Sequence, residues 1–231
     1  MSAHLERAIE RLKKRILVLS ARVEETLRSA VRSVEQRDAA LARQVVDGDY
    51  EIDKEEVDIE EECLKMLALY QPVAVDLRLV VTVLKINGVL ERIGDLAVNI
   101  AERSVFLATQ PPPKIYFDFP AMAQKTQAMV GKSLDALVRL DPELAREVSR
   151  ADDEVDAMNR EMYTQTKEGI RAHIEDLDTY IHLLSISRHL ERTADLATSI
   201  ADDVVYLVEG EIVRHRTENY HAHSGDGDAR P

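Results

Sequence analysis

Acidic residues recur at matching positions in two stretches of the sequence that begin one hundred residues apart, at 90 and 190. The first stretch is LERIGDLAVNIAERSVFL at 90–107, the second is LERTADLATSIADDVVYL at 190–207, and ten of their eighteen positions are identical. This similarity indicates that the segment was duplicated. Both copies keep acid at the same three offsets: Glu91, Asp95 and Glu102 in the first, and Glu191, Asp195 and Asp202 in the second.

The three acids of each copy fall on one stripe of a helix. At about 100° per residue, Asp95 lies about 40° and Glu102 about 20° from Glu91. The apolar residues of the same stretch lie at around 140–200°, on the opposite side. We therefore expect these carboxylates on the face of each helix that points away from the core.

A second set of acidic pairs precedes each stretch. Asp49 and Asp53 lie one helical turn apart in DGDYEIDKEEVD at 47–58. Asp152 and Asp156 have the same spacing in the similar segment RADDEVDAMNRE at 150–161. If the helices that carry these pairs are neighbours, four or five carboxylates could converge on one surface of each repeat.

Clustered carboxylates suit hard cations such as Mg²⁺, Ca²⁺, Mn²⁺ or iron, whereas zinc usually brings His or Cys as well. The alternative is a solvated helix face, because acidic residues outside a helical bundle are ordinary. Two observations favour a cation site. Like charges four positions apart destabilise a helix by roughly 0.2–0.5 kcal/mol per pair, and the two copies keep acid at these offsets while neighbouring positions differ.

Other reactive patterns are scarce. The sequence has no glycine-rich phosphate loop and no CxxC pair. Arg78 and Arg188 could hold a partner or an anion, although ion pairs along their helices are the plainer role. His182 and His189 project to the apolar side of their helix, so core or boundary positions are expected. A carboxylate-bridged metalloenzyme usually needs His ligands inside a bundle, which this outward-facing pattern lacks.

The elements that must position these acids are long helices, because apolar residues recur at spacings of three and four along most of the chain. Asp38 and Asp141 are predicted N-caps, and Pro142 suits the first turn of a helix. The predicted helices run from about 5 to 35, 39 to 70, 72 to 109, 121 to 140, 142 to 172, and 176 or 178 to 209.

The segment QPPPKIYFDFP at 110–120 is the clearest interruption, because three consecutive prolines cannot continue a helix. We therefore predict an all-α protein of two tandem, sequence-related three-helix bundles. The first bundle covers 1–109, a Pro-rich linker covers 110–120, and the second bundle covers 121–209. The tail at 210–231 is polar and aperiodic, and is expected to be disordered.

Charge and composition exclude several classes of protein. The formal net charge is -13 and no dense Lys/Arg cluster offsets it, which argues against nucleic-acid binding. A single cysteine, Cys63, excludes an intrachain disulfide and is expected to be buried. No run of eighteen apolar residues and no apolar signal-peptide core is present, so we expect a cytoplasmic protein that does not insert into a membrane.

Two long segments resemble the signature helices of a known family. The segment DLRLVVTVLKINGVLERIGDLAVNIAE at 76–102 and the segment ISRHLERTADLATSIADDVVYLVEGEIVRH at 186–215 are similar to those of the PhoU family, the phosphate-specific transport system accessory proteins. The resemblance covers residues from about 5 to 215 and includes the two-repeat layout.

The resemblance implies a fold of two similar three-helix bundles. It also implies a motif, Glu or Asp, three residues, then Asp, that binds multinuclear iron or zinc clusters; manganese and magnesium are further candidates. The motif maps here to Asp49/Asp53, Glu91/Asp95, Asp152/Asp156 and Glu191/Asp195, and the stripe geometry adds Glu102 and Asp202. Asn99 of the first repeat matches a frequent family feature, whereas Ser199 is a poorer ligand. The second site is therefore expected to bind metal more weakly or to hold fewer ions.

The family's role is regulatory and not enzymatic. PhoU-like proteins couple the phosphate ABC transporter to a membrane sensor histidine kinase, repress the phosphate-starvation response when phosphate is plentiful, and restrain phosphate uptake. The resemblance therefore implies contacts with the ATPase subunit of the transporter and with the cytoplasmic region of the kinase. A homodimer is common in the family and is expected here.

Overall fold

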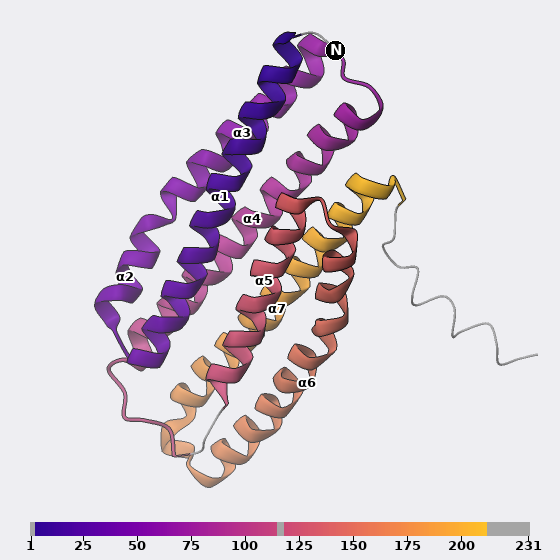
Figure 1. The fold of residues 1–231 in the computed structure, drawn as a ribbon. Coiled ribbons are helices and arrows are strands. Elements are labelled where there is room, and N and C mark those ends of the chain that lie inside the picture. Colours follow the sequence, from indigo (N-terminus) through magenta and orange to yellow (C-terminus); the bar gives the residue numbers. More distant parts are fainter. Residues whose placement is uncertain (1–2, 115–117, 212–231) are drawn as a thin grey trace, which may run out of the picture.

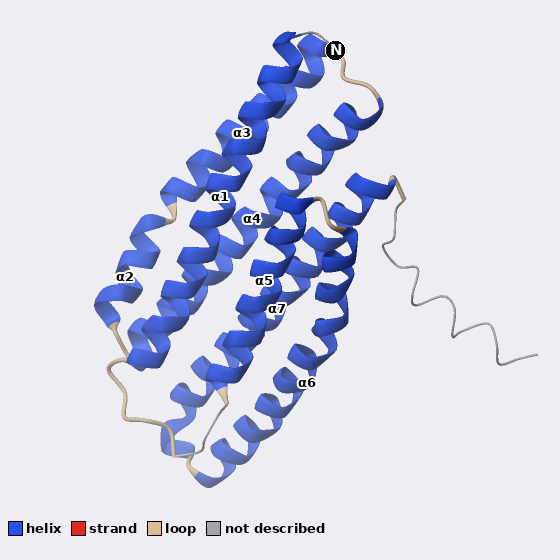
Figure 2. Ribbon diagram, in the orientation of Figure 1, coloured by secondary structure: helices blue, strands red, loops and turns tan. Residues whose placement is uncertain are grey.

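The computed structural model describes residues 3–114 and 118–211, and within these ranges all regular secondary structure is helical (Figures 1 and 2). This confirms the all-α prediction. The elements are α1 (Ala3–Gln36), α2 (Ala39–Gly48), α3 (Tyr50–Tyr70), α4 (Ala74–Leu107), α5 (Phe119–Arg139), α6 (Pro142–Ala172), the short 3₁₀ helix η1 (Ile174–Asp176) and α7 (Leu177–Glu209).

Two helix starts follow the predicted capping chemistry. The Asp38 carboxylate accepts hydrogen bonds from the backbone N–H groups of Ala40 and Leu41, at 2.9 and 3.0 Å. Asp141 likewise caps α6, where Pro142 occupies the first turn. Each carboxylate satisfies N–H groups that have no partner inside the helix, so both starts are fixed by local sequence.

The predicted single helix over 39–70 is wrong in one detail: it is divided at Asp49 into α2 and α3. Asp49 keeps helical dihedral angles, φ -59° and ψ -40°, and makes no side-chain cap. The chain therefore passes through the break without forming a loop. Gly48, which has low helix propensity and no neighbour within 4 Å of its Cβ position, lies beside the break.

The two bundles lie side by side, with the long helices α4 and α7 packed together between them and α1 in contact with α5 (Figure 1). Helices α1 to α4 form the first bundle and α5 to α7 form the second. Their apolar residues make one continuous core that runs through both bundles. An ion pair between Lys85 of α4 and Asp203 of α7, at 3.3 Å, also joins the halves.

Several smaller predictions can be compared with this arrangement. Cys63 is buried, as expected. His182 and His189 lie half-buried at the boundary between α4 and α7, and the His182 ring stacks on Phe106 with 4.0 Å between ring centroids.

Residues 212–231 of the predicted tail and residues 115–117 of the predicted linker lie outside the described residues. Over the described ranges, none of the helices has the length and apolar character needed to cross a membrane.

Candidate functional site

The first carboxylate cluster consists of Asp49 and Asp53, at the start of α3, and Glu91 and Asp95 on α4. Burial, then the charges of Asp53 and Asp95, raise the pKa of Asp49. Burial, then the charge of Asp95, raise the pKa of Glu91, with further contributions from Glu56 and Asp53. These mutual effects indicate that acids from α3 and α4 lie in one neighbourhood.

Close packing at the break between α2 and α3 brings Asp49 against α4. A Cβ atom on Gly94 would lie 3.3 Å from the Ile52 side chain and 3.7 Å from Oδ1 of Asp49. That oxygen is buried and accepts no hydrogen bond from the described residues. A buried carboxylate oxygen without a donor is costly in a folded protein and marks a position where a cation would be favourable.

Glu56 extends this cluster and was missed by the sequence analysis. Its pKa is raised by burial, then by the charges of Glu60 and Asp53. Asn87 of α4 donates its side-chain N–H₂ to the Glu56 backbone carbonyl at 2.8 Å and to Glu56 Oε1 at 3.3 Å. The signal was present in the sequence, because Glu56 lies seven residues after Asp49 and therefore on the same helix face.

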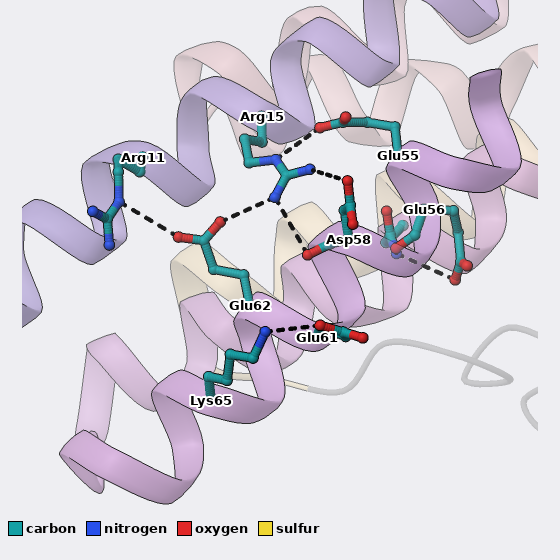
Figure 3. A network of polar contacts seen from close by, with 9 residues as sticks. Arg11, Arg15, Glu55, Glu56, Asp58, Glu61, Glu62 and Lys65 are labelled. Carbon is teal, nitrogen blue, oxygen red and sulfur yellow. Dashed lines mark hydrogen bonds and ion pairs between the residues drawn. The ribbon is translucent and has the colours of Figure 1, made fainter.

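The opposite side of α3 shows how acids behave when cations balance them. Arg15 of α1 contacts Glu55 at 2.8 Å, Asp58 at 3.3 Å and Glu62 at 3.4 Å (Figure 3). Arg11 adds a contact to Glu62 at 3.6 Å. The α3 acids that face α1 are thus neutralised by arginine, whereas no described cation lies within 4 Å of the carboxylates of the first cluster.

The second carboxylate cluster has the same construction between α6 and α7: Asp152, Asp156, Glu191 and Asp195. Burial, then the charges of Asp195 and Asp156, raise the pKa of Asp152 to about 6. Burial, then neighbouring carboxylates, also raise the pKa of Glu191 and of Asp195. Each repeat therefore gathers its predicted acidic pairs from two adjacent helices.

The surroundings of the second cluster are less acidic. Asn159 occupies the place equivalent to Glu56, and Ser187 the place equivalent to Asn87. Ser187 donates its hydroxyl to Asn159 Oδ1 at 2.6 Å, so a neutral pair replaces the charged one. The charges of Arg192 and Arg188 act to lower the pKa of Glu191, against the larger effects of burial and nearby carboxylates.

Two predicted residues lie apart from the clusters. Glu102 is exposed and pairs with its neighbour Arg103 at 3.0 Å. Asp202 lines a hollow between α4 and α7, together with Lys85 and Arg92. Both follow the cluster acids by seven residues or more along their helices, about 10 Å or more of axial rise. A shared stripe therefore does not bring them to the acidic pairs of α3 and α6.

The remaining candidates have other surroundings. Asn99 donates to the backbone carbonyl of Asp95 at 2.8 Å, and Ser199 does the same to Asp195 at 3.1 Å. Arg78 lies at the far end of α4, beside Gly210, and its buried Nε has no hydrogen-bond partner among the described residues. Arg188 lines a shallow hollow with Asn159, so it is the one predicted arginine near a cluster.

The expectation that the stripes face away from the core is only partly right. Asp95 and Asp195 are exposed, but Glu91 and Glu191 are half-buried, as are Asp49 and Asp152. The reason is that α4 and α7 are central helices, each packed against its own bundle and against the other. The clusters consequently lie at the border of the core, where burial strengthens the repulsion between carboxylates.

Comparison with known proteins identifies the family. The PhoU domain matches the chain twice, at residues 16–104 and 119–204, which together make up most of its length. The chain belongs to the PhoU family. The two matched segments confirm the tandem repeat and the resemblance seen in the signature helices.

Two PhoU relatives match most of the chain. It is 37% identical over 212 residues to the phosphate-specific transport system accessory protein PhoU homolog of Aquifex aeolicus, covering 92% of this chain and 96% of that protein. It is 35% identical to the homolog of Pseudomonas aeruginosa, covering 93% and 89%.

Solved PhoU structures share the fold. The crystal structure of PhoU from Pseudomonas aeruginosa matches with a TM-score of 0.86 at 32% identity, covering 89% of this chain and 99% of that one. The phosphate transport system regulatory protein PhoU from Streptococcus pneumoniae matches with a TM-score of 0.79 at 27% identity, covering 90% and 99%.

The chemistry of the PhoU clusters fits a hard cation. Each contributes four carboxylates with no His or Cys, and the first leaves one buried oxygen of Asp49 without a donor. Within 3–114 and 118–211, no three His, Cys, Asp or Glu side chains are already arranged to hold a metal ion. Carboxylate rotamers would have to move inward to coordinate one, and the metal site stays a prediction.

Proposed function

We propose that this PhoU-family chain is a non-enzymatic regulator of phosphate uptake and phosphate signalling, and that its two carboxylate clusters bind metal ions. The names of its relatives, accessory and regulatory proteins of phosphate transport, support the first part. The repeated meeting of acids from two helices, with pKa values raised by burial and by one another, carries the second part.

The proposed ligands are the acids that the structure brings together. The first site would use Asp49, Asp53, Glu91 and Asp95, and the second Asp152, Asp156, Glu191 and Asp195. Iron or zinc are the expected metals on the family resemblance, and manganese or magnesium also suit an all-oxygen donor set. A bound cation supplies positive charge that offsets the repulsion between the carboxylates.

The position of each cluster between two helices determines which contacts a bound metal would change. Each cluster draws on two helices, α3 with α4 or α6 with α7, so an empty cluster holds like charges across a helix contact. Neutralising those charges would strengthen both contacts and reduce the negative charge of the protein surface. A partner protein would then be able to distinguish the metal-bound surface from the metal-free surface.

The proposed partners are the ATPase subunit of the phosphate ABC transporter and the cytoplasmic region of the phosphate sensor kinase. By binding both, the protein would restrain uptake and repress the starvation response when phosphate is plentiful. It would act in the cytoplasm, as a homodimer. A pull-down with each purified partner tests this scheme, and retention of neither partner would contradict it.

Metal analysis tests the site. Replacing the exposed members, Asp95→Asn with Asp195→Asn, is expected to remove most bound metal while the circular dichroism spectrum of the helices is unchanged. A matched variant, Glu35→Gln with Asp135→Asn, removes two exposed acids outside the clusters and should keep the full metal content. Equal metal content in the two variants would rule out the proposed ligands.

A further inference from the structure

A hollow of about 390 Å³ lies between α4 and α7, and its walls come from equivalent residues of the two repeats. We call it the repeat groove. Three pairs at matching positions and one asparagine line it: Arg92 and Arg192, Asp95 and Asp195, Leu96 and Leu196, with Asn99. The two members of each pair occupy equivalent positions of the duplicated segment, and the groove lies where α4 and α7 pack against each other.

The two arginines of the repeat groove have no close ion-pair partner in the described part of the chain, although the charge of Arg192 acts on Glu191 and Asp195. Both are exposed, and neither makes a hydrogen bond or an ion pair within 4 Å to any residue in the described part of the chain. Other basic residues of α4 behave differently: Arg103 pairs with Glu102, and Lys85 pairs with Asp203 of α7. Two guanidinium groups bring ten N–H donors to one hollow. Each guanidinium is planar and can donate two parallel hydrogen bonds to two oxygens of a phosphoryl group.

Asp95 and Asp195 oppose an anion in the same groove. Two Arg and two Asp give the four side chains no net charge, so the bare groove attracts a phosphoryl group weakly. Each Asp is also a member of a carboxylate cluster, one on each side of the groove. A cation held by a cluster would neutralise the aspartate that faces the anion.

We propose that the repeat groove binds a phosphoryl oxyanion through Arg92 and Arg192, and binds it tightly only when Asp95 and Asp195 are neutralised. In the cell the neutralising agent is the metal of the two clusters, so this part rests on the proposed function. Binding of the two ligands is then linked: metal strengthens oxyanion binding, and the oxyanion strengthens metal binding by the same factor.

The coupling can be tested without metal. Inorganic phosphate is titrated into the full-length protein in a chelating buffer, with isothermal calorimetry as the measurement. The variant Asp95→Asn with Asp195→Asn removes the opposing charges and should bind phosphate about tenfold more tightly than the wild type, within the usual range of linkage between sites. Adding Arg92→Gln and Arg192→Gln to that variant should abolish the gain.

A control separates the groove from general surface charge. Arg32→Gln with Arg43→Gln changes the net charge equally at two exposed arginines of α1 and α2, outside the groove, and should leave the tighter binding intact. The proposal is overturned if the Asn variant binds phosphate no better than the wild type. It is also overturned if the gain survives loss of Arg92 and Arg192.

The metal arm distinguishes this proposal from the metal site itself. Wild-type protein loaded with Mn²⁺ and freed of excess metal should bind phosphate about tenfold more tightly than metal-free protein. If the protein takes up no metal, the proposed metal sites fail, and the chelated arm still decides the role of the arginines. If Mn²⁺ is bound but phosphate affinity is unchanged, the coupling is wrong.

The phosphoryl group could be free phosphate or part of a phosphorylated protein, and a last arm compares them. A short phosphoserine peptide is titrated beside inorganic phosphate, with its unphosphorylated form as the reference. Tighter binding of the phosphopeptide, lost with Arg92→Gln and Arg192→Gln, assigns the group to a protein. Tighter binding of inorganic phosphate, with the same loss, assigns it to the free ion.

Discussion

The two carboxylate clusters occupy equivalent places in the repeats but differ in charge. The first contains Glu56 beside its four predicted acids, and Arg15 neutralises only the α3 acids on the other side of the helix. The second has neutral Asn159 at the position of Glu56, with Arg188 and Arg192 close enough to act on Glu191. After duplication, the positions of the acids were kept while the charge around them diverged.

Packing between the helices diverged in a compensating way. Ile52 of α3 lies against Gly94 of α4, whereas the equivalent positions of the second repeat hold Val155 and Ala194. One methyl-sized group has moved from one helix to the other, so the combined side-chain volume is the same. The equal volume of the two pairs is compatible with a similar approach of the acidic helices in both repeats.

The largest expected difference between the clusters is metal affinity. Asp49→Asn with Asp95→Asn disables the first site, and Asp152→Asn with Asp195→Asn disables the second. The protein that keeps only the first site should bind Mn²⁺ at least about tenfold more tightly than the protein that keeps only the second, because Glu56 adds a fifth carboxylate. Calorimetric titration measures both, and a tighter second site would reverse the comparison.

The pH dependence of stability should separate the clusters in metal-free protein. Asp152 has a pKa of about 6 in the folded chain against 3.8 ordinarily, so the folded state holds the proton more tightly and stability falls as pH rises from about 4 to 6. Asp152→Asn should therefore raise the free energy of unfolding at pH 7 by about 1–2 kcal/mol, allowing for solvent screening. It should have little effect at pH 4.

Asp49→Asn is the matched variant from the first repeat, and its gain at pH 7 should be smaller. Urea denaturation at several pH values in a chelating buffer measures both variants. A stability gain for Asp152→Asn that is the same at pH 4 and pH 7 would contradict the role of its protonation.

The packing comparison predicts a coupling between Ile52 and Gly94. Gly94→Ala places a methyl group 3.3 Å from Ile52, and such overpacking costs about 1–3 kcal/mol, partly offset by about 1 kcal/mol of helix propensity. Adding Ile52→Val recreates the second repeat. The loss in the free energy of unfolding of the double variant should be at least about 0.5 kcal/mol smaller than the sum of the losses of the two single variants. Additive effects in a double-mutant cycle would show that the two sites pack independently.

The last comparison concerns the acids that arginine already balances. Arg15→Gln removes three carboxylate contacts and should lower the free energy of unfolding by about 1 kcal/mol. The exposed pair of Arg22 and Glu51 is the control, and Arg22→Gln should cost less than about 0.5 kcal/mol. Thermal denaturation measures both, and equal losses would mean that the Arg15 network adds nothing beyond an ordinary surface pair.

Much of this architecture could be predicted from the sequence, because its signals are local. Apolar periodicity, the caps at Asp38 and Asp141 and the prolines near residue 111 fix the long helices within a few residues. The division at Asp49 could not be predicted, since its backbone stays helical and no turn residue other than Gly48 marks it. Local sequence rules predict the start of a helix more reliably than they predict a small break within a helix.

The candidate sites show the same limit. The acidic pairs were found because duplication repeats them, whereas Glu56 has Asn159 as its counterpart and stands in a run of acids on α3. Its spacing of seven residues from Asp49 places it on the same helix face, and its contact with Asn87 of α4 distinguishes it from the other acids. Glu102 and Asp202 share a stripe with the pairs, yet α3 and α6 carry their acids to other levels of α4 and α7. The repeat groove depends on the contact of α4 with α7, which no periodicity within a single helix encodes.

The central claim is that acids from adjacent helices meet around metal ions at equivalent places in both repeats. Crystals of the protein grown with Mn²⁺ and measured for anomalous scattering test it most directly. The account predicts anomalous peaks between Asp49 and Asp95 in the first bundle and between Asp152 and Asp195 in the second. Manganese bound only elsewhere on the protein, with neither cluster occupied, would contradict it.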